Sequence, residues 1–331
     1  MSILVTGGTG FIGSHTCVEL LNAGYNIIII DNLSNSKIQV IDHIKKITGK
    51  SFQFYQMDML NKVNLDFLFQ KHKFTHIIHF AGLKSVSESN KQPLLYYSHN
   101  LTILFNLLEV MEKYNCHNII FSSSATVYTN QNVASFTPYN ESETPIGIGI
   151  TNAYGQTKYM QEKILDDLYK SNNKWNITIL RYFNPVGSHT SGLLTENPNG
   201  FPNNLMPYIV KTAKGEYKEL NIFGSDYETR DGTCIRDFIH VVDLAKGHIQ
   251  AIKKIKGFNI YNLGTGKGTS VLEIIKIFEK VHNIKLNYIM KDRRTGDVPI
   301  SYANVDKAKI ELEWQTEKTI ENMCRDSYLQ N

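Results

Sequence analysis

The sequence predicts an α/β protein, with a doubly wound parallel sheet followed by a smaller C-terminal α/β domain. Short apolar runs alternate with amphipathic stretches through the first half of the chain. A glycine-rich loop joins the first apolar run to the first amphipathic stretch. This alternation is lost after Pro185. The 331 residues exceed one average domain and fall short of three, and 42% hydrophobic with 20% charged residues is ordinary for a folded chain.

The first half is predicted to supply the parallel sheet. Its apolar runs are continuous rather than alternating, which is typical of strands covered on both faces by helices. Right-handed crossovers through the intervening helices would wind these strands into one sheet. The predicted strands are Ile3–Val5, Asn26–Ile30, Phe52–Gln56, His76–Phe80 and Ile119–Ser122, and the predicted helices are Phe11–Asn22, Ser36–Ile47, Leu60–Gln70 and Pro93–Tyr114.

The second half begins with a predicted surface loop at Pro138–Thr151, a helix at Asn152–Tyr169 and a strand at Ile177–Tyr182. Asn, Gly and Pro dominate the stretch that follows, so we place a domain boundary near residue 185. The predicted domains are residues 1–185 and 186–331, with a return of the chain to the first domain near residues 235–265. In that return, Phe238–Ala251 and Phe258–Leu263 regain helix and strand character.

Composition excludes several classes of protein. A net charge of +4 is too mild to indicate a nucleic-acid partner, and the longest isoleucine run, Ile27–Ile30, is far too short to span a membrane. The four cysteines are far apart and form no CxxC pair, which argues against zinc or other metal sites and against disulfides. Together with the lack of a signal-peptide pattern, this predicts a cytoplasmic protein. Arginine is scarce: 35 basic residues include only six arginines.

A dinucleotide site is predicted at the loop Gly7-Gly8-Thr9-Gly10-Phe11-Ile12-Gly13. The loop follows a strand and opens a helix, as in a Rossmann domain, so Gly7, Gly10, Phe11, Ile12 and Gly13 would bring backbone N–H groups to a pyrophosphate. A purely structural turn is the alternative. Asp31 ends the second strand 18 residues after Gly13 and could accept both ribose hydroxyls of an adenosine. Asn32 follows it, with no nearby Arg to receive a 2′-phosphate, so we predict NAD rather than NADP.

Two further strand ends are predicted to contact the cofactor. Asp58-Met59 follows the third strand, where the carboxylate could bind the adenine amino group or simply cap the next helix. Phe80-Ala81-Gly82 follows the fourth strand, with Lys84 just beyond. Small residues at this point would let the backbone pass close to the cofactor.

The catalytic candidates are Tyr154, Lys158 and Ser124, the last of which ends a strand in Ser122-Ser123-Ser124. Tyr154 and Lys158 are spaced i, i+4 and share one face of the predicted helix. A cation at ~4 Å with an effective dielectric of ~20 contributes about 4 kcal/mol, which would bring the pKa of Tyr154 from about 10 to near 7. Such a tyrosine could take a proton from an alcohol while hydride leaves for NAD, with Ser124 bridging the hydroxyls. A solvated helix pair is the alternative interpretation.

These motifs resemble the extended short-chain dehydrogenases/reductases. Longer stretches resemble one family of this group, the UDP-galactose (UDP-glucose) 4-epimerases. This resemblance covers nearly the whole chain. These stretches are TGGTGFIGSHTC (residues 6–17), DNLSNSK (31–37), HFAGLK (79–84), FSSSATVY (121–128), LRYFNPVG (180–187), PNNLMPY (202–208), RDFIH (236–240) and YNLG (261–264).

The resemblance implies a redox-neutral epimerisation of UDP-glucose and UDP-galactose with NAD retained. Tyr154 would take the proton of the sugar 4-hydroxyl, and a 4-ketose would turn over in the pocket. It also implies a homodimer, and a first domain for NAD with a second for the UDP-hexose. The expected cofactor contacts include His99, which stands where the family has Asn and for which Asn100 could compensate, with Ser122, Tyr154, Lys158, Tyr182 and Phe183. The expected substrate contacts are Lys84, Ser124, Tyr154, Asn184, Asn204, Leu205, Arg236, Arg294 and Asp297.

Specificity is expected to depend on Ser301, four residues after Asp297. In the family a large aromatic residue at this place restricts the enzyme to glucose and galactose, and a small one admits an N-acetyl group. Ser301 therefore predicts turnover of UDP-N-acetylglucosamine and UDP-N-acetylgalactosamine. A dehydratase of the same fold is the nearest alternative, but Ala125 and Thr126 cannot supply its extra acid/base pair. A non-catalytic NAD-binding protein is a second alternative, which the presence of Tyr154 and Lys158 opposes.

Overall fold

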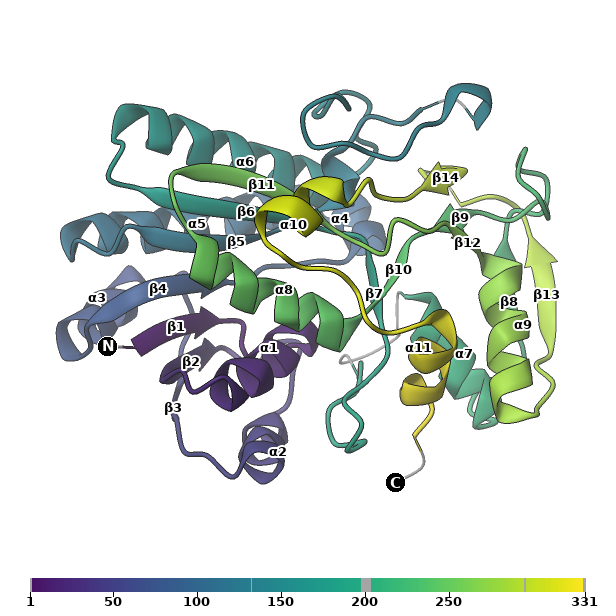
Figure 1. The fold of residues 1–331 in the computed structure, drawn as a ribbon, viewed down its shortest axis with the longest axis horizontal. Coiled ribbons are helices and arrows are strands. Elements are labelled where there is room, and N and C mark those ends of the chain that lie inside the picture. Colours follow the sequence, from purple (N-terminus) through teal and green to yellow (C-terminus); the bar gives the residue numbers. More distant parts are fainter. Residues whose placement is uncertain (1, 132, 198–203, 295, 330–331) are drawn as a thin grey trace.

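The computed structural model describes residues 2–131, 133–197, 204–294 and 296–329 (Figure 1). In this part of the chain, seven parallel strands form one sheet in the order β11-β6-β5-β4-β1-β2-β3. The predicted α/β class with a doubly wound parallel sheet is confirmed. The strands are β1 (Ser2–Thr6), β2 (Ile27–Asp31), β3 (Gln53–Gln56), β4 (Phe74–His79), β5 (Asn118–Ser124), β6 (Asn176–Tyr182) and β11 (Phe258–Leu263).

Helices cover both faces of this sheet, as the continuous apolar strands predict. Along β1, Ile3 and Val5 enter the core on one side while Leu4 enters the core on the other, because successive side chains of a strand point to opposite faces. The first core lies under α1 (Phe11–Asn22), α2 (Gln39–Thr48) and α8 (Val241–Lys254). The second lies under α3 (Lys62–Lys71), α5 (Pro93–Lys113) and α6 (Ala153–Ser171).

Two helices begin later than the sequence predicts. The helix expected from Leu60 begins at Lys62, because the Asn61 side chain accepts hydrogen bonds from the N–H groups of Val63 and Asn64 and caps the helix there. The helix expected from Ser36 begins at Gln39, since the Ser36 hydroxyl is hydrogen-bonded to the Asp31 carboxylate. A short helix, α4 (Val86–Lys91), precedes α5 and was not predicted.

The chain beyond residue 185 builds a second group of elements around its own apolar core. The strand β10 (Phe238–His240) pairs with β7 (Asn184–Val186), and β11 returns to the large sheet beside β6. The division into domains at residue 185 stays a prediction. The remaining elements are α7 (Leu205–Ala213), β8 (Leu220–Phe223), β9 (Ile235–Arg236), β12 (Thr269–Ser270), α9 (Val271–His282), β13 (Tyr288–Lys291), β14 (Ile300–Ser301), α10 (Asp306–Glu311) and α11 (Ile320–Ser327).

No helix in the described ranges has the length and apolar character needed to cross a membrane.

Candidate functional site

A cavity of about 1460 Å³ lies at the carboxyl ends of the sheet strands and is closed by residues from the second half of the chain. Most of the predicted site residues line it, although they come from widely separated segments. They are Gly7, Gly10, Phe11, Ile12, Gly13, Asp31, Asn32, Asp58, Met59, Phe80, Ala81, Gly82, Lys84, His99, Ser122, Tyr154, Lys158, Tyr182, Asn184, Asn204, Leu205, Arg236, Arg294 and Asp297.

Three predicted site residues do not line the cavity. Phe183 is buried in a cluster with Tyr128, Tyr139 and Ala303, because it follows the cavity-lining Tyr182 and points to the other side of the backbone. Ser301 lies on β14 opposite Arg236, and its carbonyl accepts a hydrogen bond from the N–H of Asp237. Ser124 accepts hydrogen bonds from the N–H and the hydroxyl of Thr126 and lies within hydrogen-bonding reach of Tyr154.

The glycine loop forms a cradle that leaves no room for side chains. Gly7 has a φ of +68°, and a Cβ on it would lie 2.7 Å from the backbone nitrogen of Ala81. A Cβ on Gly13 would lie 2.3 Å from the carbonyl oxygen of Gly7. Among the described residues no side chain caps α1 after Gly10, and its first turn has no acidic residue. Its N–H groups and positive dipole end therefore suit an anion such as a pyrophosphate.

The Asp31 carboxylate is oriented by three donors. Its Oδ2 accepts from the N–H of Thr9 at 3.1 Å, and its Oδ1 accepts from the N–H of Leu33 at 2.9 Å and from the Ser36 hydroxyl at 3.3 Å. A carboxylate offers about four acceptor positions, so one on Oδ2 is left for a ribose hydroxyl. Thr9 and Ser36 were missed in the sequence, since neither belongs to the glycine pattern.

Asp58 lines the cavity but does not cap the next helix, so that alternative is wrong, and binding of adenine stays a prediction. Its Oδ1 accepts from the N–H of Leu60 at 2.8 Å, which shapes the turn before α3, while Asn61 is the residue that caps the helix. Its Oδ2 accepts from the Asn32 side chain at 3.2 Å, which joins the ends of β2 and β3 at the cavity wall.

Tyr154 and Lys158 face the cavity from α6. The Lys158 Nζ is buried, donates to the carbonyl oxygen of Ser122 at 2.6 Å and lies 6.0 Å from the centre of the Tyr154 ring. Tyr182, from the neighbouring β6, shares a hydrogen bond of 2.5 Å with the His248 ring, which orients it toward the cavity.

The expected lowering of the Tyr154 pKa by Lys158 is wrong for the protein alone. Burial raises the pKa of Tyr154 to about 12, and the hydrogen bond with Ser124 only partly opposes this. Burial also lowers the pKa of Lys158 to about 8, against the charge of Glu162, which raises it. The reason is desolvation, which disfavours both charged forms and which the Coulomb estimate from the sequence left out.

Two arginines and one aspartate form the cationic end of the cavity. Arg294 donates through Nε to Asp297 at 3.1 Å and stacks 4.8 Å from the Phe223 ring centre, while Arg236 Nη2 lies 3.9 Å from Asp297. Asp297 thus holds both guanidinium groups in one place, where they suit two-pronged binding of a diphosphate. Phe223 also lines the cavity and was not predicted.

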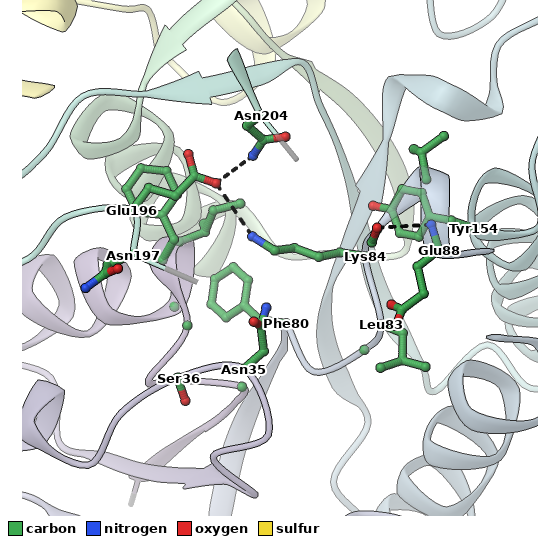
Figure 2. A pocket seen from close by; sticks show the side chains of 18 of the residues that line it. Asn35, Ser36, Phe80, Leu83, Lys84, Glu88, Tyr154, Glu196, Asn197 and Asn204 are labelled. Carbon is green, nitrogen blue, oxygen red and sulfur yellow. Dashed lines mark hydrogen bonds and ion pairs between the residues drawn. The ribbon is translucent and has the colours of Figure 1, made fainter. Parts of the chain in front are cut away.

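Glu196 is the most notable cavity residue that the sequence did not reveal. Figure 2 shows its carboxylate between Lys84, whose Nζ lies 3.8 Å away, and Asn204, whose amide donates at 2.5 Å. Its Oε2 has no hydrogen-bond partner among the described residues, and burial raises its pKa. It lies in an irregular stretch with no periodic or motif signal, so no pattern marked it.

Asn100 does not compensate for His99, contrary to expectation. Its amide is buried and holds the backbone of Leu83 by two hydrogen bonds, of 2.8 and 3.0 Å, and contacts Thr157. It therefore fixes the loop that carries Lys84, whereas His99 itself lines the cavity.

Known proteins are similar to this chain over nearly its whole length. Residues 3–264 match the model of the NAD dependent epimerase/dehydratase family. The UDP-glucose 4-epimerase of Bacillus subtilis is 52% identical over 331 residues, which cover 99% of this chain and 96% of that protein. The enzyme of the same name from Mus musculus is 48% identical, with 98% of this chain and 94% of that protein covered.

Among solved structures, UDP-sugar 4-epimerases are similar to this chain in both fold and sequence. The UDP-glucose 4-epimerase from Bifidobacterium longum in complex with NAD+ and UDP is similar with a TM-score of 0.94, 48% identity, and 99% and 97% of the two chains covered. The UDP-Glc/GlcNAc 4-epimerase from Campylobacter jejuni is similar with a TM-score of 0.83, 33% identity, and 99% and 98% coverage.

Proposed function

The chain belongs to the NAD dependent epimerase/dehydratase family, and from this premise we propose that it interconverts UDP-glucose and UDP-galactose by transient oxidation at C4. One observation carries the proposal. The glycine cradle, the Tyr154–Lys158 pair and the Arg236–Asp297–Arg294 cluster line a single cavity. A nucleotide cofactor and a nucleotide sugar can therefore meet at one tyrosine.

NAD is the cofactor, and the residues present fit it. The steric limits at Gly7 and Gly13, the uncapped start of α1 and the remaining acceptor position of Asp31 suit a pyrophosphate and an adenosine ribose. Bound NAD supplies the chemistry of accepting a hydride from C4 of the sugar and returning it.

The side chains of the protein would handle the proton and hold the substrate. Tyr154 Oη takes the proton of the 4-hydroxyl and later gives it back, helped by the positive charge of Lys158 and the hydrogen bond with Ser124. Arg236 and Arg294 grip the diphosphate, with Asn184, Asn204 and Leu205 beside them. A firm grip on the nucleotide leaves the hexose free to present either face to the cofactor.

The proposal extends to the N-acetyl sugars. Ser301 does not line the cavity itself, but it is a small residue on the strand directly beside the cavity-lining Arg236, so it adds no bulk next to that wall. A related protein with 33% identity is a UDP-Glc/GlcNAc 4-epimerase. Both points support turnover of UDP-N-acetylglucosamine and UDP-N-acetylgalactosamine by this chain.

We further propose that the protein is a cytoplasmic homodimer. All four cysteines are unpaired and buried, which suits a reducing compartment. Exposed apolar side chains on α5 and α6, among them Leu94, Phe105 and Met160, suit an interface between two copies of the chain.

The test is a chromatographic assay of the purified protein with UDP-galactose and UDP-N-acetylgalactosamine side by side. We expect both to be converted to their 4-epimers, and Tyr154→Phe to lower kcat by about a hundredfold to ten-thousandfold, which is the usual contribution of an acid/base group. Tyr159→Phe, on the same helix but outside the cavity, should keep full activity.

Two outcomes would contradict the proposal in different ways. Full activity of Tyr154→Phe would overturn the mechanism. Conversion of UDP-galactose without any conversion of the N-acetyl sugar would overturn only the role of Ser301.

A further inference from the structure

The residues of α6 that face the sheet meet the end of β5 at three successive points. Tyr154, Lys158 and Glu162 are spaced by four residues, so they lie one turn apart on one side of the helix. Each is bound by one serine of β5: Ser124 is hydrogen-bonded to Tyr154, the Ser122 carbonyl accepts from Lys158, and the Ser123 hydroxyl donates to Glu162. The third of these contacts, between Glu162 and Ser123, does not line the cavity and has no part in the proposed chemistry.

Glu162 is buried and paired with Arg181. Its Oε2 accepts from Nη2 of Arg181 at 2.7 Å and its Oε1 accepts from Nε at 3.1 Å, while the two side chains are 4% and 1% exposed. Arg181 lies on β6 directly opposite Ser123 on β5. The Glu162 carboxylate therefore ties α6 to both strands at once, with two-pronged geometry that fixes its position.

The negative charge of the same carboxylate acts on Lys158, one helical turn away. The titratable groups that act on the ammonium are Tyr154 and Glu162 on α6 and His79 on β4, and the Phe121 ring lies 4.7 Å from its Nζ. Arg181 on β6 acts through its ion pair with Glu162. Burial keeps His79 neutral by lowering its pKa to about 3. Burial also lowers the pKa of Lys158, and the charge of Glu162 raises it again. The charge of Glu162 therefore favours the ammonium form of Lys158.

We propose that Glu162 is a positioning residue of the reaction, which holds Lys158 in register beside Tyr154 and supplies the negative charge that keeps Lys158 an ammonium ion. Arg181 and Ser123 hold Glu162 in turn. The inference rests on the proposed roles of Tyr154 and Lys158. Glu162 itself does not line the cavity and touches neither substrate nor cofactor.

The main experiment is the pH dependence of kcat and KM for UDP-galactose in Glu162→Gln. We expect kcat to fall at least tenfold and its alkaline limb to move to lower pH by about one unit, because Lys158 loses its proton earlier. KM should change less than twofold, since the variant leaves the cavity lining intact. Asp167→Asn, an exposed carboxylate on the same helix paired with Lys163, is the matched control and should behave as wild type.

A second variant separates positioning from stability. Glu162→Gln leaves Arg181 buried without a counter-ion, which by itself can prevent folding. The double variant Glu162→Gln with Arg181→Met removes both charges together and restores a neutral core. If Glu162 served only to neutralise Arg181, this double variant would recover the wild-type kcat and pH profile, which would overturn the inference. We expect the low kcat and the shifted limb to persist.

A measurement without turnover completes the test. Nuclear magnetic resonance of protein labelled with carbon-13 at lysine Cε reports the titration of Lys158, whose signal is identified by its loss in Lys158→Met. We expect the titration midpoint to be lower in Glu162→Gln than in wild type, and an equal midpoint would contradict the inference. If wild-type protein failed to epimerise UDP-galactose, the proposed function would fall, while this titration would still decide the link between Glu162 and Lys158.

Discussion

The six arginines show how little of a residue's role can be judged from its type. Only Arg236 and Arg294 line the cavity. Arg181 is buried against Glu162, whereas Arg230 and Arg293 form exposed pairs with Glu273 and Asp226. Two-pronged hydrogen bonding is thus seen for Arg181 in the core and for Arg230 and Arg293 on the surface, and the sixth arginine, Arg325, lies on α11.

At the scale of single residues, Glu196 is predicted to make the binding of UDP-glucose depend on pH. Its buried carboxylate shares the cavity with the cations that would bind the diphosphate, so its charge opposes binding of an anion. Burial raises its pKa, so the neutral form persists to higher pH than in an ordinary glutamate and ionises as the pH rises. We expect the Kd of UDP-glucose to increase by about tenfold between about pH 5 and pH 8, and to stay flat in Glu196→Gln.

Calorimetric titration in a Tyr154→Phe background, in which turnover is slowed, measures this Kd. The diphosphate of UDP-glucose stays fully ionised over that range, so the ligand does not contribute to the change. Glu216→Gln removes a carboxylate from an ion pair with Lys211 outside the cavity and should leave the pH dependence unaltered. If the Kd of UDP-glucose changed with pH equally in wild type and in Glu196→Gln, ionisation of Glu196 would be ruled out as the cause.

At the scale of elements, the start of α1 is held against two other segments by the glycine cradle. The carbonyl of Gly7 accepts from the N–H of Gly10 at 3.1 Å, and Gly13 passes so close to Gly7 that a Cβ has no room. On the other side, Gly7 lies against the backbone of Ala81 at the end of β4. The end of β4, the glycine loop and the start of α1 can therefore lie this close together only because Gly7 and Gly13 have no side chains.

Gly13→Ala is expected to push α1 away from this loop, because its Cβ would lie 2.3 Å from the Gly7 oxygen. We expect a loss of about 1–3 kcal/mol of stability, as for other overpacked sites, together with loss of bound NAD. Thermal unfolding and the NAD released on denaturation measure the two effects. Gly49→Ala, at an exposed left-handed position with open space, should cost about 1 kcal/mol and keep its NAD. Full NAD content in Gly13→Ala would contradict this account.

The whole molecule brings together residues that are far apart in the chain. Lys84 and Glu196 meet across the cavity. In the chain, β11 returns to the large sheet beside β6 between two parts of the second group of elements (Figure 1). Outside the cavity, α5 exposes Leu94 and Phe105, which are 82% and 45% exposed, and α6 exposes Met160. These helices lie side by side, so their exposed apolar groups form one candidate surface for a second copy.

We therefore expect light scattering after size-exclusion chromatography to give twice the mass of the chain. Phe105→Glu combined with Leu94→Glu should give a monomer, because two charges would be buried in the interface without partners. Ile310→Glu, at an exposed position on α10, is the control and should remain a dimer. A wild-type protein that elutes with the mass of one chain would contradict the expectation.

Much of the fold could be predicted because its signals are local. Continuous apolar strands, helix periodicity and the glycine loop each depend on a few neighbouring residues, so β1 to β6 were expected close to their observed positions. Helix starts were less predictable, since the side chains of Asn61 and Ser36 decided them. The spacing of Tyr154 and Lys158 is likewise local, and it placed both on the cavity side of α6.

The sequence by itself determined the fold class, the glycine cradle and the pairing of Tyr154 with Lys158, because these follow from short-range spacing and backbone freedom. Only the tertiary structure decided which side chains reach the cavity and which charges are buried. It turned Phe183 away, brought Glu196 beside Lys84, and joined Glu162 to Arg181. The physical reason is that burial and Coulomb interactions depend on contacts between distant segments. Burial raised the pKa of Tyr154 to about 12, where the sequence had suggested a lowering.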